Sequence, residues 1–442
     1  MSFRAGNIRS YRDDVEISLL ATRLAQQGVP REMHVQGLAS PISVLPAAGV
    51  FGANASGKSR LLHAMADMRN LVLRSFRHGD ATSRILRRPF LLDPASREAP
   101  SEFHVDLILN GTRWQYGFEV DDYRVLGEYA YSSPRGRRSL VFERELEDIR
   151  FGPAFRTSGR ALERISRHNS LLLSVAGLAD DENLGALFIW FVKNMRHAEI
   201  SSRGIRAALT ANMINDSRQR DRVLGLLRAA ELGITDAEVT NLDIDPEAQE
   251  HLNQALRILH GTDGEPDEDT DYLVGDFVRL AHHGTQSDIL FDPDDESAGT
   301  MVWVGLVGPV IETLDEGALL LADELDASLH PHLVQRLVAL FQDPYTNPNS
   351  AQLVFNAHDV SVLGDSERRS LGRDQIWFTE KDQDGTTRLY PLSDFRPRRD
   401  EALERRYLQG RFGGVPMLNT GEFLRAIHPD LDSDPDRELA EP

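Results

Sequence analysis

Several residue types are scarce in this sequence, and each absence excludes a class of chemistry. Its 442 residues include no cysteine, which excludes disulfide bonds, thiolate metal ligands and a cysteine nucleophile. Only three of the 49 basic residues are lysines, at positions 58, 193 and 381, so a lysine inside a specific motif is less expected by chance. The most apolar stretch, Ala186–Val192, is far shorter than the ~20 residues that cross a bilayer. Because the N-terminus has no signal-like apolar run, we expect a soluble, cytoplasmic protein without a membrane partner.

The charge balance is acidic. There are 69 acidic and 49 basic residues, which leaves a formal net charge of −20. Such a chain is not a general polyanion binder, and any contact with nucleic acid would need a local basic patch. The length predicts two or three domains, and the 41% hydrophobic content is enough for a sizeable core.

The most informative motif is Gly52–Ser59, which fits the phosphate-binding pattern Gly-x-x-x-x-Gly-Lys-Ser. The apolar residues before it predict a buried strand over 48–51. The spacing of Leu61, Met65, Met68 and Val72 predicts a helix after it. In this context the backbone N–H groups of the loop and of the helix N-terminus point at phosphates.

This strand, loop and helix predict a site for ATP. The glycines let the backbone approach the phosphates without a Cβ clash. Lys58 would bring a charge to the β- and γ-phosphates, and the Ser59 hydroxyl would bind Mg²⁺. The alternative interpretation is a chance glycine turn before a helix. The expected ATP-binding residues are Gly52, Asn54, Ser56, Gly57, Lys58, Ser59 and Arg60.

A second motif is an apolar strand, predicted over 319–322, that ends in Asp323 and Glu324. This is the Walker B pattern. Asp323 would hold Mg²⁺ together with Ser59, and Glu324 would act as general base on the attacking water. Alone, the pattern also fits an ordinary strand followed by an acidic helix cap. The phosphate loop upstream favours the catalytic interpretation.

Three shorter motifs surround the Walker B strand. Glu296–Thr300 places small and hydroxyl residues at a predicted helix start, which can cradle an anion or be a plain N-cap. Asp326 follows the paired carboxylates in a loop. His358 follows the next predicted strand, over 353–355. There it can bond the γ-phosphate and orient the attacking water, or have no role.

These five elements, in this order, resemble the ABC-type ATPase heads of the SMC, RecF and OLD group. The resemblance is closer to the AAA family ATPases of bacterial phage defence, which include the AbiL-type ATPases, the RloB-associated ATPases and AriA of the PARIS system. It covers most of the chain, and the stretches that carry it are Gly52–Ser59, Glu296–Thr300, Asp323–Pro331 and Tyr407–Pro416. Two features depart from the pattern. Ser297-Ala298-Gly299 replaces the Ser-Gly-Gly signature of transporter heads, and no residue is assigned as the usual Q-loop glutamine, for which Gln115 is a candidate.

The resemblance implies partners as well as a fold. Two heads would pair head to tail around ATP, with Ser297 and Gly299 acting on the nucleotide of the other subunit and Asp326 in the D-loop. The chain would therefore form at least an ATP-dependent homodimer. The resemblance further implies an effector encoded nearby, such as a TOPRIM or RloB-like nuclease, and a phage protein as the trigger of abortive infection.

The expected fold class is α/β: a P-loop ABC-type ATPase head with an N-terminal antiparallel β region and a helical insertion domain. We expect an N-terminal lobe over 1–150, the insertion over 151–285, a C-terminal lobe over 286–395, and an extension over 396–442 with an acidic tail from 430. The pair Asn110-Gly111 predicts a hairpin turn in the first lobe. Helical patterns in the insertion cover Ala161–Val175, Leu184–Met195, Arg220–Ala230 and Pro246–Leu259.

Two other functions remain open from the sequence. A DNA-maintenance ATPase similar to RecF or SMC would bind DNA as an ATP-dependent dimer. The acidic balance and the lack of sustained heptads disfavour it. A small-molecule kinase would need the phosphate loop but has no use for Ser297, Gly299 or His358.

Overall fold

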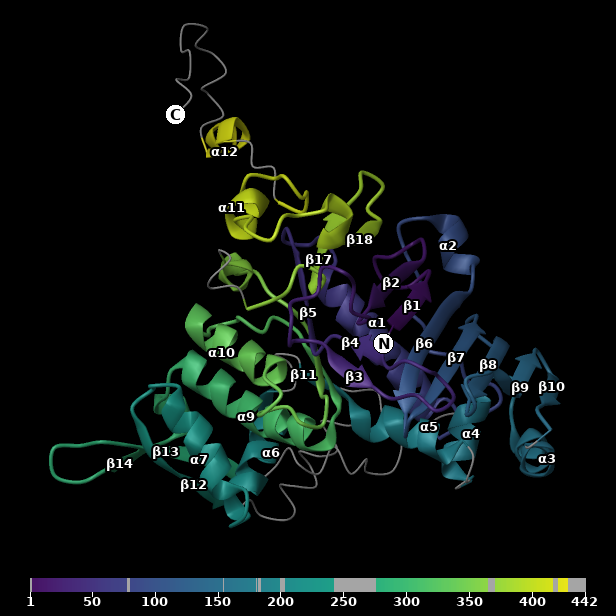
Figure 1. The fold of residues 1–442 in the computed structure, drawn as a ribbon, viewed down its shortest axis with the longest axis horizontal. Helices are drawn as coiled ribbons and strands as arrows, with labels where there is room; N and C mark the ends of the chain where they lie inside the picture. Colours follow the sequence, from purple (N-terminus) through teal and green to yellow (C-terminus); the bar gives the residue numbers. More distant parts are fainter. Residues whose placement is uncertain are drawn as a thin grey trace, which may run out of the picture.

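A computed structural model describes residues 2–77, 80–153, 155–179, 181, 184–198, 203–241, 276–364, 370–415 and 420–427. Two large sheets and the helices that pack on them make up the fold (Figure 1). The helix expected over Pro246–Leu259 and the tail expected from residue 430 lie outside the described residues. In the described part of the chain, every helix is too short or too polar to cross a membrane.

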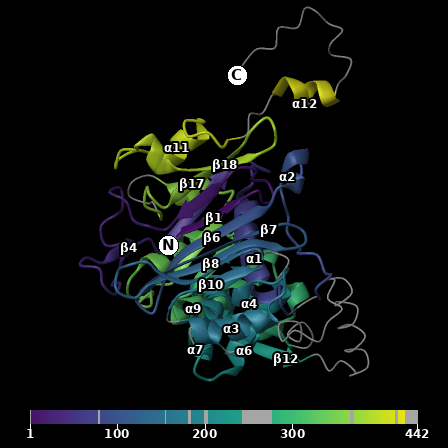
Figure 2. The same cartoon turned by 90° about the vertical axis from the view of Figure 1, so that its right-hand side faces the viewer.

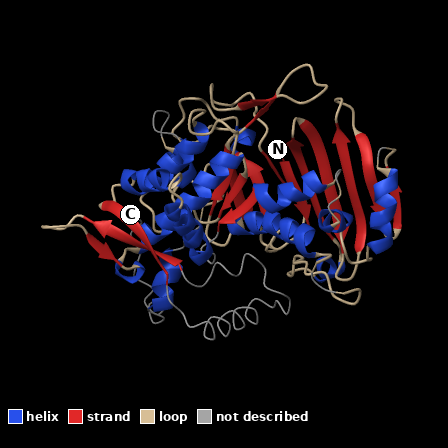
Figure 3. Ribbon diagram, turned by 90° about the horizontal axis from the view of Figure 1, so that it is seen from below, coloured by secondary structure: helices blue, strands red, loops and turns tan. Residues whose placement is uncertain are grey.

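The first sheet is antiparallel, with seven strands in the order β10-β9-β8-β7-β6-β1-β2 (Figure 3). As predicted, Asn110 and Gly111 form the turn between β6 and β7. Both have positive φ, 50° and 71°, as a tight two-residue hairpin turn requires. The strands are β1 (Ser2–Gly6), β2 (Val15–Ser18), β6 (Ser101–Leu109), β7 (Thr112–Val120), β8 (Val125–Ser133), β9 (Ser139–Glu145) and β10 (Asp148–Phe151).

The second sheet carries the phosphate loop. Its order is β11-β15-β16-β5-β17-β18, and its strands run parallel except for the pair β17 and β18. The apolar runs at 319–322 and 353–355 form neighbouring parallel strands, as predicted. The strands are β5 (Ala47–Gly52), β11 (Met195–Ala198), β15 (Leu319–Ala322), β16 (Gln352–Asn356), β17 (Ile376–Lys381) and β18 (Thr387–Pro391).

Helices cover both faces of the parallel sheet, so its strands are apolar on both sides. Ala48 and Val50 of β5 pack with α1 (Lys58–Arg74) and the antiparallel sheet. Phe51 points the other way, into the core made with α9 (Ala298–Glu316) and α10 (Pro331–Gln342). Figure 2 shows β6, β7 and β8 facing the viewer, with α3 and α4 below them. Helix α1, predicted from four apolar residues that are all buried, thus lies between the two sheets.

The segment 151–285 contributes strands as well as helices. Strand β11 extends the parallel sheet beside β15, and α6 and α7 pack on α9. Strands β12, β13 and β14 form a small antiparallel sheet. The elements here are α3 (Arg156–Ile165), α4 (Leu172–Leu178), α5 (Gly185–Ile189), a π-helical turn (Trp190–Asn194), α6 (Arg203–Asn215), α7 (Arg220–Ala229), β12 (Ile234–Asn241), β13 (Asp276–His282) and, just after it, β14 (Ile289–Phe291). The remaining short elements are β3 (Arg31–Met33), β4 (Ile42–Val44), α2 (Pro94–Glu98), α11 (Leu403–Leu408) and α12 (Thr420–Ile427).

The single helix expected over Ala161–Val175 is wrong, because a buried carboxylate starts a new helix inside it. Glu128 of β8 is 1% exposed and accepts hydrogen bonds from the backbone N–H groups of Leu172 (2.6 Å) and Leu173 (3.0 Å). These groups have no partner within their own helix. Burial raises the pKa of Glu128, while Arg144 acts in the opposite direction. The break therefore depends on a distant strand, which helical periodicity cannot reveal.

Candidate functional site

The phosphate loop leaves β5 at Gly52 and enters α1 at Lys58. Its turn requires left-handed backbone at Ala55 (φ 62°) and Gly57 (φ 108°). A Cβ atom on Gly57 would lie 2.4 Å from the Thr387 hydroxyl, and one on Gly52 would lie 2.5 Å from the Thr379 carbonyl oxygen. Both glycines are therefore required by close packing against β17 and β18, and the loop is held from its outer side.

Lys58 lies under this loop and is only 4% exposed. Its ammonium group donates hydrogen bonds to the carbonyl oxygens of Gly52 (2.8 Å) and Ala53 (3.0 Å). Burial lowers the pKa of Lys58, and the nearby carboxylates of Asp326, Glu324 and Asp323 act in the opposite direction. The charge is thus held beside the loop by weak carbonyl partners, which a phosphate group can replace.

Ser59 and Asp323 are brought together by Asn356, at the end of β16. The Asn356 amide donates to the Ser59 hydroxyl (3.2 Å) and to the Asp323 carboxylate (2.5 Å). Burial opposes ionisation of Asp323, but hydrogen bonds from His63, Ser59 and Asn356 together hold its pKa below the ordinary value. The Ser59 hydroxyl and the Asp323 carboxylate, which the sequence analysis predicts to act together, therefore lie close to each other. The lowered pKa of Asp323 favours its ionised form.

Glu324 lies next to this pair in a strained conformation. Its φ is 50°, which is unusual for a residue with a long side chain and is commonest at functional sites. Its backbone N–H donates to the Asn356 side-chain oxygen. The His358 ring lies 3.9 Å from the Glu324 carboxylate, and both side chains are partly exposed. Both groups are thus open to solvent at the same end of the sheet as the phosphate loop.

Asp326 positions the His358 loop through the backbone. One of its carboxylate oxygens accepts from the N–H groups of His358 (2.8 Å) and Asp359 (2.6 Å). The predicted D-loop aspartate therefore ties the residues after β15 to the residues after β16, and fixes where His358 stands relative to Glu324.

A magnesium ion in this site would draw on two oxygen donors of the chain, Ser59 and Asp323. Oxygen ligands are the ones that Mg²⁺ prefers, and it usually keeps waters and takes further ligands from substrate phosphates. In the described ranges no group of three or more histidine and acidic side chains is placed to hold a metal. A site with two protein ligands that is completed by a nucleotide fits this arrangement, so the residues present fit Mg²⁺.

The other expected ATP-binding residues differ in exposure. Asn54 and Arg60 are exposed beside the loop. Ser56 is 3% exposed, and its hydroxyl lies 2.6 Å from that of Thr379. The side chain of Ser56 therefore supports the loop from behind, which leaves its backbone N–H for contact with a ligand.

Ser297 and Gly299 lie at the start of α9. Ser297 is the N-cap, and its hydroxyl oxygen accepts from the Thr300 N–H at 3.1 Å. A Cβ atom on Gly299 would lie 2.5 Å from the Ser328 carbonyl oxygen, so this segment packs on the loop after Asp326. Among the described residues, no hydrogen bond joins Ser297 or Gly299 to the phosphate loop of the same chain.

Three residues of the site were not predicted. Asn356 links Ser59 to Asp323, and Thr379 supports Ser56. His63 lies 3.5 Å from Asp323 and packs its ring on that of His197, 5.6 Å away. His63 follows Ser59 by four residues, so helical spacing alone would have placed both on one face of α1. Nothing in the local sequence marks Asn356 or Thr379. Gln115, the Q-loop candidate, lies in β7 and bonds Asp106 at 3.5 Å.

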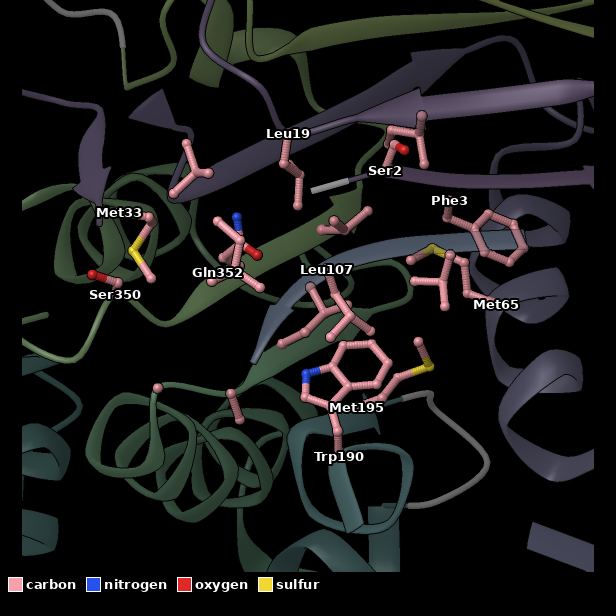
Figure 4. Close-up of a pocket in the computed structure, with 18 of the residues that line it drawn as sticks. Ser2, Phe3, Leu19, Met33, Met65, Leu107, Trp190, Met195, Ser350 and Gln352 are labelled. Carbon is pink, nitrogen blue, oxygen red and sulfur yellow. The ribbon is translucent and has the colours of Figure 1, made fainter. Parts of the chain in front are cut away.

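A separate cavity of about 120 Å³ lies between the two sheets (Figure 4). Met33, Met65, Trp190 and Met195 line it, together with Leu319 at the beginning of β15. The residues of the candidate site follow the other end of this strand. The cavity is therefore distinct from the phosphate loop, at the opposite edge of the parallel sheet.

In this α/β domain the phosphate loop meets an acidic strand end, and the first helix after the loop packs under an antiparallel sheet. This is the predicted fold, that of a P-loop ATPase head of the ABC type. Comparison with known families agrees. A model described as "AAA domain, putative AbiEii toxin, Type IV TA system" matches residues 47–364, and the chain belongs to this family of nucleotide-binding ATPase domains. None of the curated proteins matches it.

Solved structures of SMC heads are among those similar to this chain. An SmcHead bound to the C-winged helix domain of ScpA is 12% identical, with a TM-score of 0.41 over 89% of this chain and 98% of its own. The SMC head domain from Thermotoga maritima is 13% identical, with a TM-score of 0.38 over 88% and 97%. An Smc head with an extended coiled coil, bound to the C-terminal domain of ScpA derived from Pyrococcus furiosus, is 12% identical, with a TM-score of 0.35 over 93% and 98%.

Proposed function

We propose that this chain binds ATP with Mg²⁺ and hydrolyses it. The observation that carries the proposal is the hydrogen-bonded link from Ser59 through Asn356 to Asp323. It joins the helix that begins in the phosphate loop to Asp323, which directly follows β15. A structural acidic cap would not need this bridge to the phosphate-loop hydroxyl.

The residues have distinct roles in the proposed reaction. Mg²⁺, when bound by Ser59 and Asp323, neutralises phosphate charge. Lys58 exchanges its carbonyl partners for the β- and γ-phosphates. Glu324 accepts the proton of the attacking water as general base, and His358 orients that water beside the γ-phosphate.

The signature segment supports a homo-oligomer. Ser297 and Gly299 present a capped helix start with free backbone N–H groups, which suits an anion. Within one chain this helix start faces the Ser328 loop, not the phosphate loop. We propose that it completes the site of a second copy, so that ATP holds at least two chains together and hydrolysis releases them.

The biological role that we propose is that of a cytoplasmic sensor and scaffold in phage defence by abortive infection. The four stretches that resemble the defence ATPases support it, and so does the toxin–antitoxin description of the family. None of the described helices is long and apolar enough to span a membrane. The toxic activity would belong to a separate effector encoded nearby, such as a TOPRIM or RloB-like nuclease, and a phage protein would act as the trigger.

The test is the native mass of Glu324→Gln, purified with its flanking gene products, with and without ATP and Mg²⁺. This substitution removes the base but leaves the ATP ligands, so we expect an oligomer that persists with ATP and carries a second protein. Wild type should release the oligomer as ATP is consumed, and Lys58→Ala should not form it.

Two results would contradict the proposal. A Glu324→Gln chain that hydrolyses ATP at the wild-type rate would refute the role of Glu324. A chain that assembles only when ATP and DNA are both present would favour the DNA-maintenance ATPase instead. In that case, binding that weakens steeply with salt would show contact with the phosphate backbone.

A further inference from the structure

The stretch Tyr407–Pro416 has a distinctive sequence but no role in the proposed reaction. Its residues Arg411–Val415, which we name the return segment, follow α11 and run back to the phosphate loop. A Cβ atom on Gly414 would lie 3.5 Å from the Cα atom of Gly52 and 3.2 Å from the Thr379 carbonyl oxygen. The backbone of the return segment therefore lies directly against the first glycine of the phosphate loop.

Thr379, the fourth residue of β17, lies between the return segment and the loop. It is fully buried. Its hydroxyl lies 2.6 Å from the Ser56 hydroxyl and donates to the Phe51 carbonyl at 3.4 Å. Its own carbonyl oxygen faces both Gly52 and Gly414. A movement of the return segment that displaced Thr379 would therefore affect the phosphate loop at both Gly52 and Ser56.

Aromatic rings hold the return segment in place. Tyr407 and Phe412 both stack on Phe378, with ring centroids 5.3 and 5.7 Å apart. The Tyr407 hydroxyl donates to the Gly414 carbonyl at 2.8 Å, and the Tyr390 hydroxyl donates to the Phe412 carbonyl at 2.9 Å. Figures 1 and 2 both draw α11 beside β17 and β18. The anchor residue Phe378 directly precedes Thr379, so the anchor and the contact lie on the same strand.

The glycines of the return segment are required by this docking. Gly413 and Gly414 both have left-handed backbone, with φ of 69° and 67°. A Cβ atom on Gly413 would lie 2.5 Å from the Tyr390 hydroxyl. Two successive residues with positive φ let the chain turn sharply against the loop, and a side chain at either position would push it away.

We propose that the return segment is part of the nucleotide-binding site. It holds the Gly52 side of the phosphate loop in its binding conformation, so ATP affinity and docking of the segment are coupled. The inference rests on the proposed function, because it concerns the affinity for ATP. Coupling of this kind is reciprocal: a segment that favours ATP binding must itself be stabilised by ATP.

The first test compares the affinity of three variants for a fluorescent, non-hydrolysable ATP analogue with Mg²⁺. Gly414→Ala should weaken binding about tenfold, within the usual range for coupled sites. Gly28→Ala is the matched control. Its φ is 83°, and a Cβ atom there meets nothing within 4 Å, so it adds similar backbone strain away from the site and should stay within about twofold.

Tyr407→Phe tests the same coupling between docking of the return segment and ATP affinity, without adding any atoms to the site. It keeps the ring on Phe378 but removes the hydrogen bond to Gly414, and should weaken binding about threefold. It also keeps the inference testable if Gly414→Ala does not fold.

The second test is hydrogen exchange of residues 411–415 with and without the analogue. Slower exchange with the analogue in wild type, and no change in Lys58→Ala, would support the coupling. Equal affinities of Gly414→Ala, Tyr407→Phe and Gly28→Ala, with exchange unaffected by the analogue, would overturn it while the ATPase proposal stands. A wild-type chain that binds no analogue would instead overturn the proposed function itself, and the coupling with it.

Discussion

The phosphate loop and the signature segment both begin a helix, yet their surroundings differ. Around α1, Lys58, Ser59 and Asp323 are tied to one another or to the loop by hydrogen bonds, and Lys58 and Asp323 are largely buried. At α9, the Ser297 hydroxyl caps its own helix by accepting a hydrogen bond from the Thr300 N–H. The polar groups of the first region are therefore linked by hydrogen bonds within one chain.

This difference indicates which part of the proposed nucleotide site a second copy of the chain would supply. A helix start with free N–H groups attracts an anion only if the anion is brought to it. Within one chain, Gly299 packs on the loop of Ser328. Under the proposed function, the nucleotide that it contacts is bound to the phosphate loop of another chain. Three substitutions test this division of the site.

The largest effect is expected for Lys58→Ala. It removes the ammonium group held under the phosphate loop, so ATP binding should weaken by about 100-fold or more, which is ~2.7 kcal/mol or above. Titration with a fluorescent ATP analogue measures it. Lys193→Ala is the matched control, because Lys193 is an exposed lysine in the π-helical turn. The affinity of this variant for the ATP analogue should equal that of wild type. An unchanged affinity of Lys58→Ala would refute the phosphate-loop assignment.

A different loss is expected for Gly299→Val, which forces the signature segment away from Ser328. The single chain should bind ATP normally, but hydrolysis and ATP-dependent association should fall by about tenfold or more, since one positioned electrostatic group is lost. Gly225→Ala, where a Cβ meets nothing within 4 Å, is the control and should behave as wild type.

Mixing variants shows whether the signature acts between chains. Lys58→Ala retains an intact signature, and Gly299→Val retains an intact phosphate loop. A mixed dimer rebuilds one complete site, so hydrolysis in the mixture should exceed that of either variant alone. If the mixture stays inactive while both variants are folded, Gly299 does not act on the partner's nucleotide.

The smallest effect is expected for Asn356→Ala. It leaves Ser59 and Asp323 in the chain but removes the amide that joins them, so the apparent affinity for Mg²⁺ in the presence of the ATP analogue should fall by about tenfold. Binding of the analogue without metal should change little. The Mg²⁺ dependence of analogue fluorescence measures both quantities.

Asn347→Ala is a closely matched control for this change. Asn347 is also fully buried, and its amide bonds only backbone groups, at Phe341 and Ala351. Both variants should unfold at lower temperature, but only Asn356→Ala should need more Mg²⁺. Equal Mg²⁺ dependence in the two variants would mean that Asn356 stabilises the fold without positioning the metal ligands.

Much of the fold follows from local patterns. The apolar runs at 319–322 and 353–355 are too short for helices and lack polar alternation, which indicates strands buried on both faces. Asn110-Gly111 predicts its turn because both residues tolerate positive φ. The phosphate loop and the acidic strand end are equally local, and the carboxyl ends of parallel strands bring them to one edge of the sheet.

Other features are invisible to such patterns because their partners are distant in the chain. The break between α3 and α4 depends on Glu128, more than 40 residues earlier. In the sequence, Asn356 is an ordinary polar residue at a strand end, and its link to Asp323 forms only because β16 lies beside β15. Gly414 is likewise one glycine among several, and its contact with Gly52 forms only because the chain turns back after α11.

The sequence by itself determined which residues carry the proposed chemistry: one lysine in a glycine loop, one hydroxyl after it, and two carboxylates after a strand. The tertiary structure alone decided how they are held. Hydrogen bonds and ring stacking act over a few ångströms, and only folding brings Asn356, Thr379 and Gly414 within that distance of the loop.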